Sequence, residues 1–108
     1  MPTAIVTGCA RGIGRAIALQ LAKDGYSMAL NDLPSSVRLL NDLKRDLTGR
    51  NPEIKAIVTT GDITLETEVQ RMVDETVRGL GSLDVVRTSS WPAWSLLVFW
   101  FLTGQYRW

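Results

Sequence analysis

The sequence contains no histidine and only one cysteine, Cys9, among its 108 residues. Histidine is the commonest general base near neutral pH and the commonest metal ligand, so we expect neither a metal site nor histidine-based catalysis. One cysteine cannot form an internal disulfide, and the first residues lack the basic and apolar stretches of a secretory signal. These absences predict a reducing, cytoplasmic compartment.

A surplus of either charge is also missing. Twelve Lys and Arg residues are matched by 11 Asp and Glu residues, which gives a net charge of +1. Proteins that bind nucleic acid carry a marked positive surplus, so we expect no nucleic-acid partner. The length corresponds to one small domain and is short for a nucleotide enzyme that also needs a substrate site.

Short apolar runs alternate with segments of helical periodicity. The runs predict strands at 3–7, 26–32, 54–60 and 83–86. The periodic segments predict helices that begin at Gly12, at Ser35 or Ser36, and after Thr64 as N-cap, and that end near Gly25, at residues 48–52, and at Gly79 and Gly81. Strands that alternate with helices of this length indicate βαβ units, and therefore an α/β fold with a parallel sheet.

Each predicted helix has one apolar stripe that we expect to be buried. The stripes comprise Ile13, Ala16, Ile17 and Leu21; Val37, Leu40, Leu43 and Leu47; and Val69, Met72, Val73, Thr76 and Leu80.

The turn TGCARGIG, residues 7–14, places Gly8, Gly12 and Gly14 between the first strand and the first helix. Backbone N–H groups at a helix N-terminus favour phosphate oxygens, and side chains at these glycines would crowd a phosphate. The pattern therefore predicts a phosphate-binding turn. Glycine-rich turns also occur for packing reasons, and that alternative stays open.

Two acidic residues end predicted strands on the same edge of the sheet. Asp32 lies 18 residues after Gly14, near the spacing at which an acid binds the adenosine ribose of a dinucleotide. Asp62 and Ile63 could flank the adenine, although Asp32 and Asp62 could also serve only to begin loops. A carboxylate at Asp32 favours NAD, whereas Arg11 in the turn could accept the 2′-phosphate of NADP. We favour NAD and leave NADP open.

These motifs resemble the short-chain dehydrogenase/reductase family over residues 3–86. TGCARGIG matches the TGxxxGIG turn of that family, and LND, GDIT and GSLDVV resemble its second-strand acid, its adenine-flanking Asp and its fourth strand. The resemblance implies a partial Rossmann-type doubly wound sheet of about four strands in the order 3-2-1-4 with three helices. It also implies NAD(P) on the carboxyl edge and hydride exchange with an alcohol or carbonyl. The cofactor contacts that it implies are Gly8, Gly12, Ile13, Gly14, Asp32, Asp62 and Ile63. Arg11, placed in the turn by the sequence, completes the predicted contacts.

The resemblance stops after the fourth strand. The family has an Asn-Asn-Ala-Gly turn there, and this chain has RTSS. The family's Tyr-x-x-x-Lys pair is also missing, because Leu30 follows Tyr26 by four places and only two residues follow Tyr106. We therefore expect a cofactor-binding chain that is catalytically inactive. A stand-alone nucleotide-binding or interaction module is the alternative.

Residues 88–108 differ from residues 1–87, the predicted NAD(P)-binding segment, in containing nearly all the large aromatic side chains. These are Trp91, Trp94, Phe99, Trp100, Phe101, Tyr106 and Trp108. The change predicts a truncated or mis-spliced form of a longer enzyme, without the family's oligomer interface. The apolar run is short for a bilayer span, so we expect no membrane association. A cap on the sheet, an exposed sticky tail, and a half-sheet too unstable to fold also stay open.

Overall fold

The computed structural model describes residues 2–88. The elements are β1 (Thr3–Thr7), α1 (Gly12–Lys23), β2 (Ser27–Leu30), the 3-10 turn η1 (Pro34–Ser36), α2 (Val37–Arg50), β3 (Ala56–Val58), α3 (Glu66–Leu80) and β4 (Val85–Thr88). The four strands form one parallel sheet in the order β3-β2-β1-β4. This confirms the predicted α/β fold and strand order. The predicted tail, apart from Thr88, lies outside the described residues.

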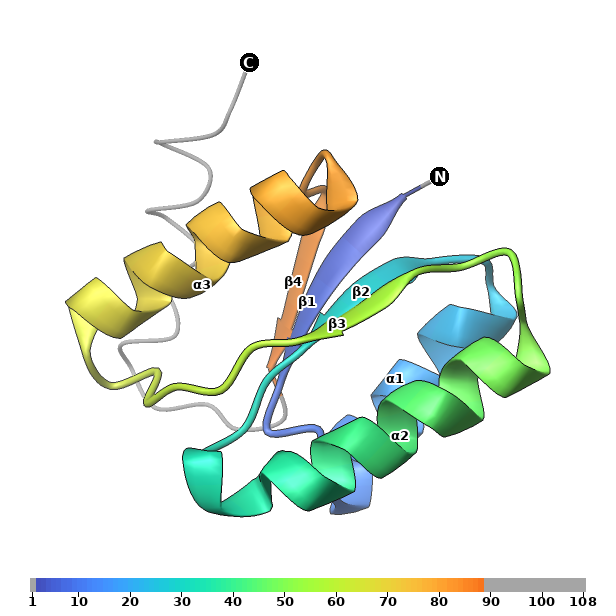
Figure 1. Cartoon of the computed structure of the whole chain (residues 1–108), viewed down its shortest axis with the longest axis horizontal. Coiled ribbons are helices and arrows are strands. Elements are labelled where there is room, and N and C mark those ends of the chain that lie inside the picture. Colours follow the sequence, from blue (N-terminus) through green and yellow to red (C-terminus); the bar gives the residue numbers. More distant parts are fainter. Residues whose placement is uncertain (1, 89–108) are drawn as a thin grey trace.

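The sheet is covered on both faces. Helices α1 and α2 lie on one face and α3 lies on the other (Figure 1). Alternate strand residues supply the two cores, as the two-residue period of a strand requires. The larger core contains Val6, Met28 and Leu30, and the smaller core packs Ile5 and Ala29 against α3.

Three predicted stripe positions of α1 and α2 are wrong. Ile13 is 72% exposed and Val37 is 44% exposed, and Ala16 is exposed as well. The buried face of α1 instead runs through Gly14, Ala18, Leu21 and Ala22, because Gly14 lies against the preceding turn. The remaining stripe residues of α2 and α3 are buried or half-buried as predicted.

The helix ends agree only in part with the predictions. Gly25 (φ 91°) follows α1 and, with Tyr26, donates hydrogen bonds back to Ala22 and Leu21 in a Schellman arrangement. Gly81 (φ 87°) ends α3, whereas Gly79 lies inside that helix. Thr64 is not an N-cap, because Leu65 holds that position and makes no side-chain capping bond.

The predicted strands at 26–32 and 54–60 are longer than β2 and β3. Asn31 and Thr59 directly follow β2 and β3 and begin the connecting loops, although their N–H groups still donate to Val6 and Leu30 of the neighbouring strands. No helix within residues 2–88 is long and apolar enough to span a bilayer.

Candidate functional site

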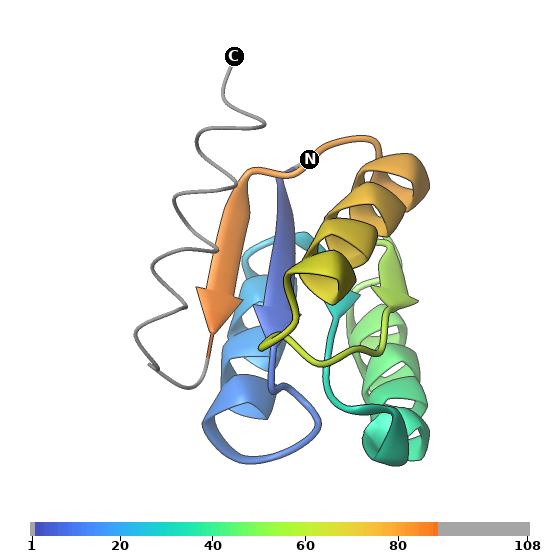
Figure 2. The ribbon, with the colours of Figure 1, turned by 90° about the vertical axis from the view of Figure 1, so that its left-hand side faces the viewer.

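The carboxyl ends of the four strands point to the same edge of the sheet (Figure 2). Backbone hydrogen bonds join the loops that follow the first three of them. Cys9 N–H donates to the Asn31 carbonyl at 3.1 Å, and Gly61 N–H donates to the Asp32 carbonyl at 3.1 Å. The glycine turn, the end of β2 and the segment after β3 are therefore one connected structure.

The three glycines of the turn are required for different reasons. Gly8 and Gly12 have φ values of 62° and 63°, the left-handed region that side chains disfavour. A Cβ on Gly12 would meet nothing within 4 Å, whereas a Cβ on Gly14 would lie 2.2 Å from the Gly8 carbonyl oxygen. Gly14 is therefore needed for the packing of the turn itself, the alternative role that the sequence left open, and crowding of a ligand by side chains at the three positions stays a prediction.

The first turn of α1 lies at this edge and has no side-chain cap. Arg11 occupies the N-cap position in an extended conformation and makes no side-chain capping bond. The first turn contains no acidic residue, so its partial positive charge is not neutralised from within. Both Arg11 and Ile13 are exposed beside it. Such a helix start favours an anionic group.

Asp32 lies next to the glycine turn, as predicted. Its Oδ2 accepts a hydrogen bond from Ala10 N–H at 3.1 Å, and its Oδ1 accepts one from Leu33 N–H at 2.8 Å. The side chain is half-buried. The loop-forming role of Asp32 is therefore present, and contact with a ribose stays a prediction.

Asn31 joins the loops, and the sequence did not single it out. Its buried side-chain amide donates to the carbonyls of Thr59 at 2.9 Å and Gly61 at 3.3 Å, and it contacts Met72 Sδ at 3.3 Å. Its backbone carbonyl accepts the bond from Cys9. The feature of the sequence that could have identified Asn31 is an amide side chain at the end of an otherwise apolar strand.

Cys9 is a buried, free thiol in the turn. Its Sγ donates to the Asn31 carbonyl at 3.4 Å. Burial raises the pKa of the thiol to about 12, and the nearby Asp32 carboxylate adds to the rise. The thiol is therefore protonated near neutral pH, and Cys9 contributes to the packing of the turn.

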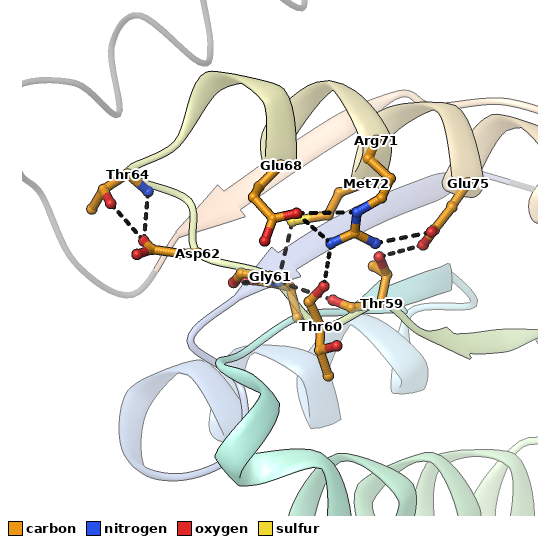
Figure 3. A network of polar contacts seen from close by, with 10 residues as sticks. Thr59, Thr60, Gly61, Asp62, Thr64, Glu68, Arg71, Met72 and Glu75 are labelled. Carbon is orange, nitrogen blue, oxygen red and sulfur yellow. Dashed lines mark hydrogen bonds and ion pairs between the residues drawn. The ribbon is translucent and has the colours of Figure 1, made fainter.

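Asp62 begins the loop before α3. Its Oδ1 accepts hydrogen bonds from the Thr64 hydroxyl at 2.6 Å and the Thr64 N–H at 2.9 Å (Figure 3). These two bonds lower the pKa of Asp62 below its ordinary value. Ile63 is half-buried and packs against the smaller core. The loop-forming role of Asp62 is therefore present, and contact with adenine stays a prediction.

Comparison with known proteins identifies the family and supports the fold. The model of the family described as short chain dehydrogenase matches residues 2–89. The chain belongs to the short-chain dehydrogenase/reductase family.

No group of three or more potential metal-binding side chains occurs in the part of the chain that the structure describes.

Two curated relatives and one solved structure illustrate the similarity. Short-chain dehydrogenase/reductase eriH of Hericium erinaceus is 47% identical over 87 residues, which are 77% of this chain and 33% of the relative. The 3-oxoacyl-[acyl-carrier-protein] reductase FabG of Staphylococcus epidermidis is 40% identical over 87 residues, 78% of this chain and 33% of the relative. The solved structure is that of an alcohol dehydrogenase from Thermococcus sibiricus with 5-hydroxy-NADP. It is 31% identical in sequence and superposes with a TM-score of 0.71, and the match covers 80% of this chain and 35% of the dehydrogenase chain. The chain thus spans about a third of the length of these relatives.

Proposed function

We propose that this chain binds NAD or NADP across the carboxyl edge of its sheet, as the nucleotide-binding part of a short-chain dehydrogenase/reductase. The observation that carries the proposal is the positive-φ glycine turn leading into an uncapped helix start, with the Asp32 carboxylate beside it. Pyrophosphate suits the helix start, and a ribose suits the carboxylate. The NADP derivative bound by the Thermococcus sibiricus relative supports a dinucleotide as ligand.

The residues present fit such a cofactor. The space beside Gly12 is open, because a Cβ there would meet no atom within 4 Å. Gly8, Gly12 and Gly14 would form the pyrophosphate turn, with Arg11 and Ile13 exposed beside it. At the other end, Asp32 would hold the adenosine ribose, and Asp62 with Ile63 would border the adenine. When bound, the nicotinamide supplies a hydride donor or acceptor.

We propose NAD rather than NADP as the preferred form. Each Asp32 carboxylate oxygen accepts one N–H bond within the protein, and a carboxylate oxygen has two acceptor positions. The remaining positions can accept from the two ribose hydroxyls, whereas a 2′-phosphate would meet a negative charge. The exposed Arg11 is the one turn residue that favours a 2′-phosphate.

We infer that the 108-residue chain does not itself catalyse the reduction or oxidation of a ketone, a 3-oxoacyl group or an alcohol. In the family that reaction uses a tyrosine whose pKa a nearby lysine lowers, and the sequence contains no Tyr-x-x-x-Lys. We also place the chain in a reducing compartment such as the cytoplasm, since its one cysteine is a free, buried thiol.

Titration with NADH, followed by the fluorescence of the nicotinamide, tests the proposed cofactor binding. The same assay with an added substrate tests the proposed lack of activity. We expect Gly12→Asp to weaken NADH binding at least tenfold, roughly 1.4 kcal/mol, because it adds a negative charge to the turn. Gly49→Asp, in the exposed last turn of α2 with open space around it, is the matched control and should bind like the wild type. An absence of NADH binding at millimolar concentration would refute the cofactor proposal. Steady oxidation of NADH that depends on a ketone or 3-oxoacyl substrate would refute the inactivity.

A further inference from the structure

The segment from Thr59 to Asp62 is held from two sides. On the buried side, the Asn31 amide donates to the carbonyls of Thr59 and Gly61. On the solvent side, Arg71 of α3 donates from Nη2 to the Thr60 carbonyl at 2.6 Å (Figure 3). The backbone carbonyls of three successive residues therefore accept hydrogen bonds from two side chains, one in the loop after β2 and one on α3.

Acidic neighbours orient the Arg71 guanidinium. Nε and Nη2 donate to Glu68 at 3.1 and 2.9 Å, and Nη1 donates to Glu75 at 2.9 Å. These bonds raise the pKa of Arg71 above its ordinary value. Glu75 in turn accepts a 2.6 Å bond from the Thr59 hydroxyl. The helix thus reaches the segment through Arg71 and through Glu75.

Arg71 also packs directly on the segment. A Cβ on Gly61 would lie 2.8 Å from Arg71 Nη2 and 3.1 Å from Met72 Sδ. Gly61 is buried beneath these two side chains. Arg71 and Met72 therefore lie against the side of the segment that faces α3.

The contact with Thr60 distinguishes Arg71 from an ordinary surface arginine. Its pairs with Glu68 and Glu75 have the i,i+3 and i,i+4 spacings found on any helix surface, and exposed pairs of this kind contribute little to stability. The bond from a cation to a loop carbonyl 11 residues earlier is not a product of helix geometry. It joins α3 to the loop that carries Asp62 and Ile63.

We propose that Arg71 is a positioning residue for the adenine end of the dinucleotide, acting through Thr60 and Gly61 on Asp62 and Ile63. The inference rests on the proposed cofactor binding. Arg71 itself does not touch the ligand. It fixes the segment between β3 and α3 before the ligand arrives, so binding does not have to order that segment.

The test compares Arg71→Met with Arg71→Lys and with a control, Arg50→Met, in the full 108-residue chain. Methionine keeps an apolar stem and removes every donor, and lysine retains a charge that can reach the Thr60 carbonyl. Arg50 forms a similar i,i+4 pair with Asp46 at 2.9 Å on α2. The readouts are hydrogen exchange of the Gly61 amide without ligand, and binding of AMP and of inorganic pyrophosphate by NMR titration.

We expect Arg71→Met to accelerate exchange of the Gly61 amide and to weaken AMP about tenfold, while pyrophosphate affinity stays within about twofold. Arg71→Lys should recover most of the AMP affinity, and Arg50→Met should leave all three readouts unchanged. AMP and pyrophosphate losses of equal size would indicate general damage to the fold and would overturn the inference.

Two further outcomes separate the inference from the proposed function. Unchanged AMP affinity and Gly61 exchange in Arg71→Met would overturn the positioning role and leave cofactor binding intact. A wild-type chain that binds neither AMP nor NADH would overturn the proposed function, and with it the role of Arg71 in ligand binding. Gly61 exchange would still report whether Arg71 holds the segment.

Discussion

The side-chain Oδ2 of Asp32 lies 3.1 Å from the backbone nitrogen of Ala10, which donates a hydrogen bond to it. The bond joins the end of β2 to the glycine turn, 22 residues earlier in the chain. The carboxylate that would bind a ribose therefore also holds the turn that would bind the pyrophosphate. A substitution at Asp32 consequently changes two parts of the site, and an experiment has to separate them.

Asp32→Ala should weaken NAD binding more than NADP binding. It removes the acceptor for the ribose hydroxyls, which matters for NAD, and the negative charge that opposes a 2′-phosphate, which matters for NADP. We expect a loss for NAD of about tenfold or more, since hydrogen bonds to a charged group contribute about 1.5–3 kcal/mol. Calorimetric titration of each cofactor measures the two changes.

The matched control is Asp32→Asn, which removes the charge but keeps one acceptor oxygen for Ala10 or Leu33. It should retain more of the stability of the turn than Asp32→Ala and should still shift preference toward NADP. Equal losses of NAD and NADP in both variants would show that Asp32 acts only on the turn, and the ribose assignment would then be wrong.

Alanine at three glycines should give three different stabilities. Gly14→Ala should cost about 3 kcal/mol or more in the free energy of unfolding, because its Cβ would lie 2.2 Å from the backbone oxygen of Gly8. Gly12→Ala should cost about 1–2 kcal/mol, because its φ is 63° but the space is open. Gly49→Ala, in helical conformation with no nearby atoms, should stabilise by about 0.5–1 kcal/mol. Urea unfolding followed by circular dichroism measures all three.

The order of these three variants carries the test. A Gly12→Ala variant less stable than Gly14→Ala would contradict the assignment of close packing to Gly14 and backbone conformation to Gly12.

The sequence predicted the elements of the site but not all the reasons for them. The strand-turn-helix pattern predicted the positions of Gly8, Gly12 and Gly14, and the spacing to Asp32 predicted its place beside the turn. Spacing cannot reveal that Gly14 meets the chain's own carbonyl, since that depends on how α1 packs on β1. Nor can it distinguish an exposed Ile13 from a buried one at the first turn of a helix that projects past the sheet edge.

Long-range polar contacts were the other part that the sequence did not predict. Asn31 is a polar residue at the end of a strand, and Arg71 is a charged residue on a helix surface. Neither is unusual in its local sequence pattern. Their roles arise only when the fold brings Thr59, Thr60 and Gly61 beside them. The predicted capping role of Thr64 failed for a local reason, because α3 begins one residue later than predicted, with Leu65 at the N-cap position.

Asn31→Leu should lower the free energy of unfolding by about 3 kcal/mol, because it leaves two buried carbonyls without their side-chain donor. Leucine has a similar volume, so the loss reports hydrogen bonds more than packing. Asn41→Leu, at an exposed position of α2, is the control and should change stability by less than about 0.5 kcal/mol. A similar, small effect of both substitutions in urea unfolding would argue against Asn31 as the link between the loops.

Thr59→Val should raise the pKa of Glu75 toward its ordinary value of 4.5. The Thr59 hydroxyl is the main cause of the lowered pKa, and Arg71 adds to it. Because the folded-state pKa is lowered, Glu75 stabilises the fold above its unfolded pKa, and this contribution disappears as the pH falls through the folded value. Thr48→Val, whose hydroxyl bonds only to helix carbonyls, should leave the pKa of Glu75 unchanged in a carbon-13 NMR titration of the carboxyl group.

The Cys9 thiol should make the fold less stable at high pH. Its pKa is raised from 9.0 to about 12, so between these values the unfolded chain loses a proton that the folded chain keeps. The contribution of the thiol is therefore complete below pH 9, and the free energy of unfolding should fall by up to about 1.4 kcal/mol per pH unit above it. Urea unfolding from pH 8 to pH 11 measures the slope, and Cys9→Ala should reduce it. An equal slope in both proteins, or rapid alkylation of the native thiol by iodoacetamide at pH 8, would show that Cys9 is not held in its protonated, buried state.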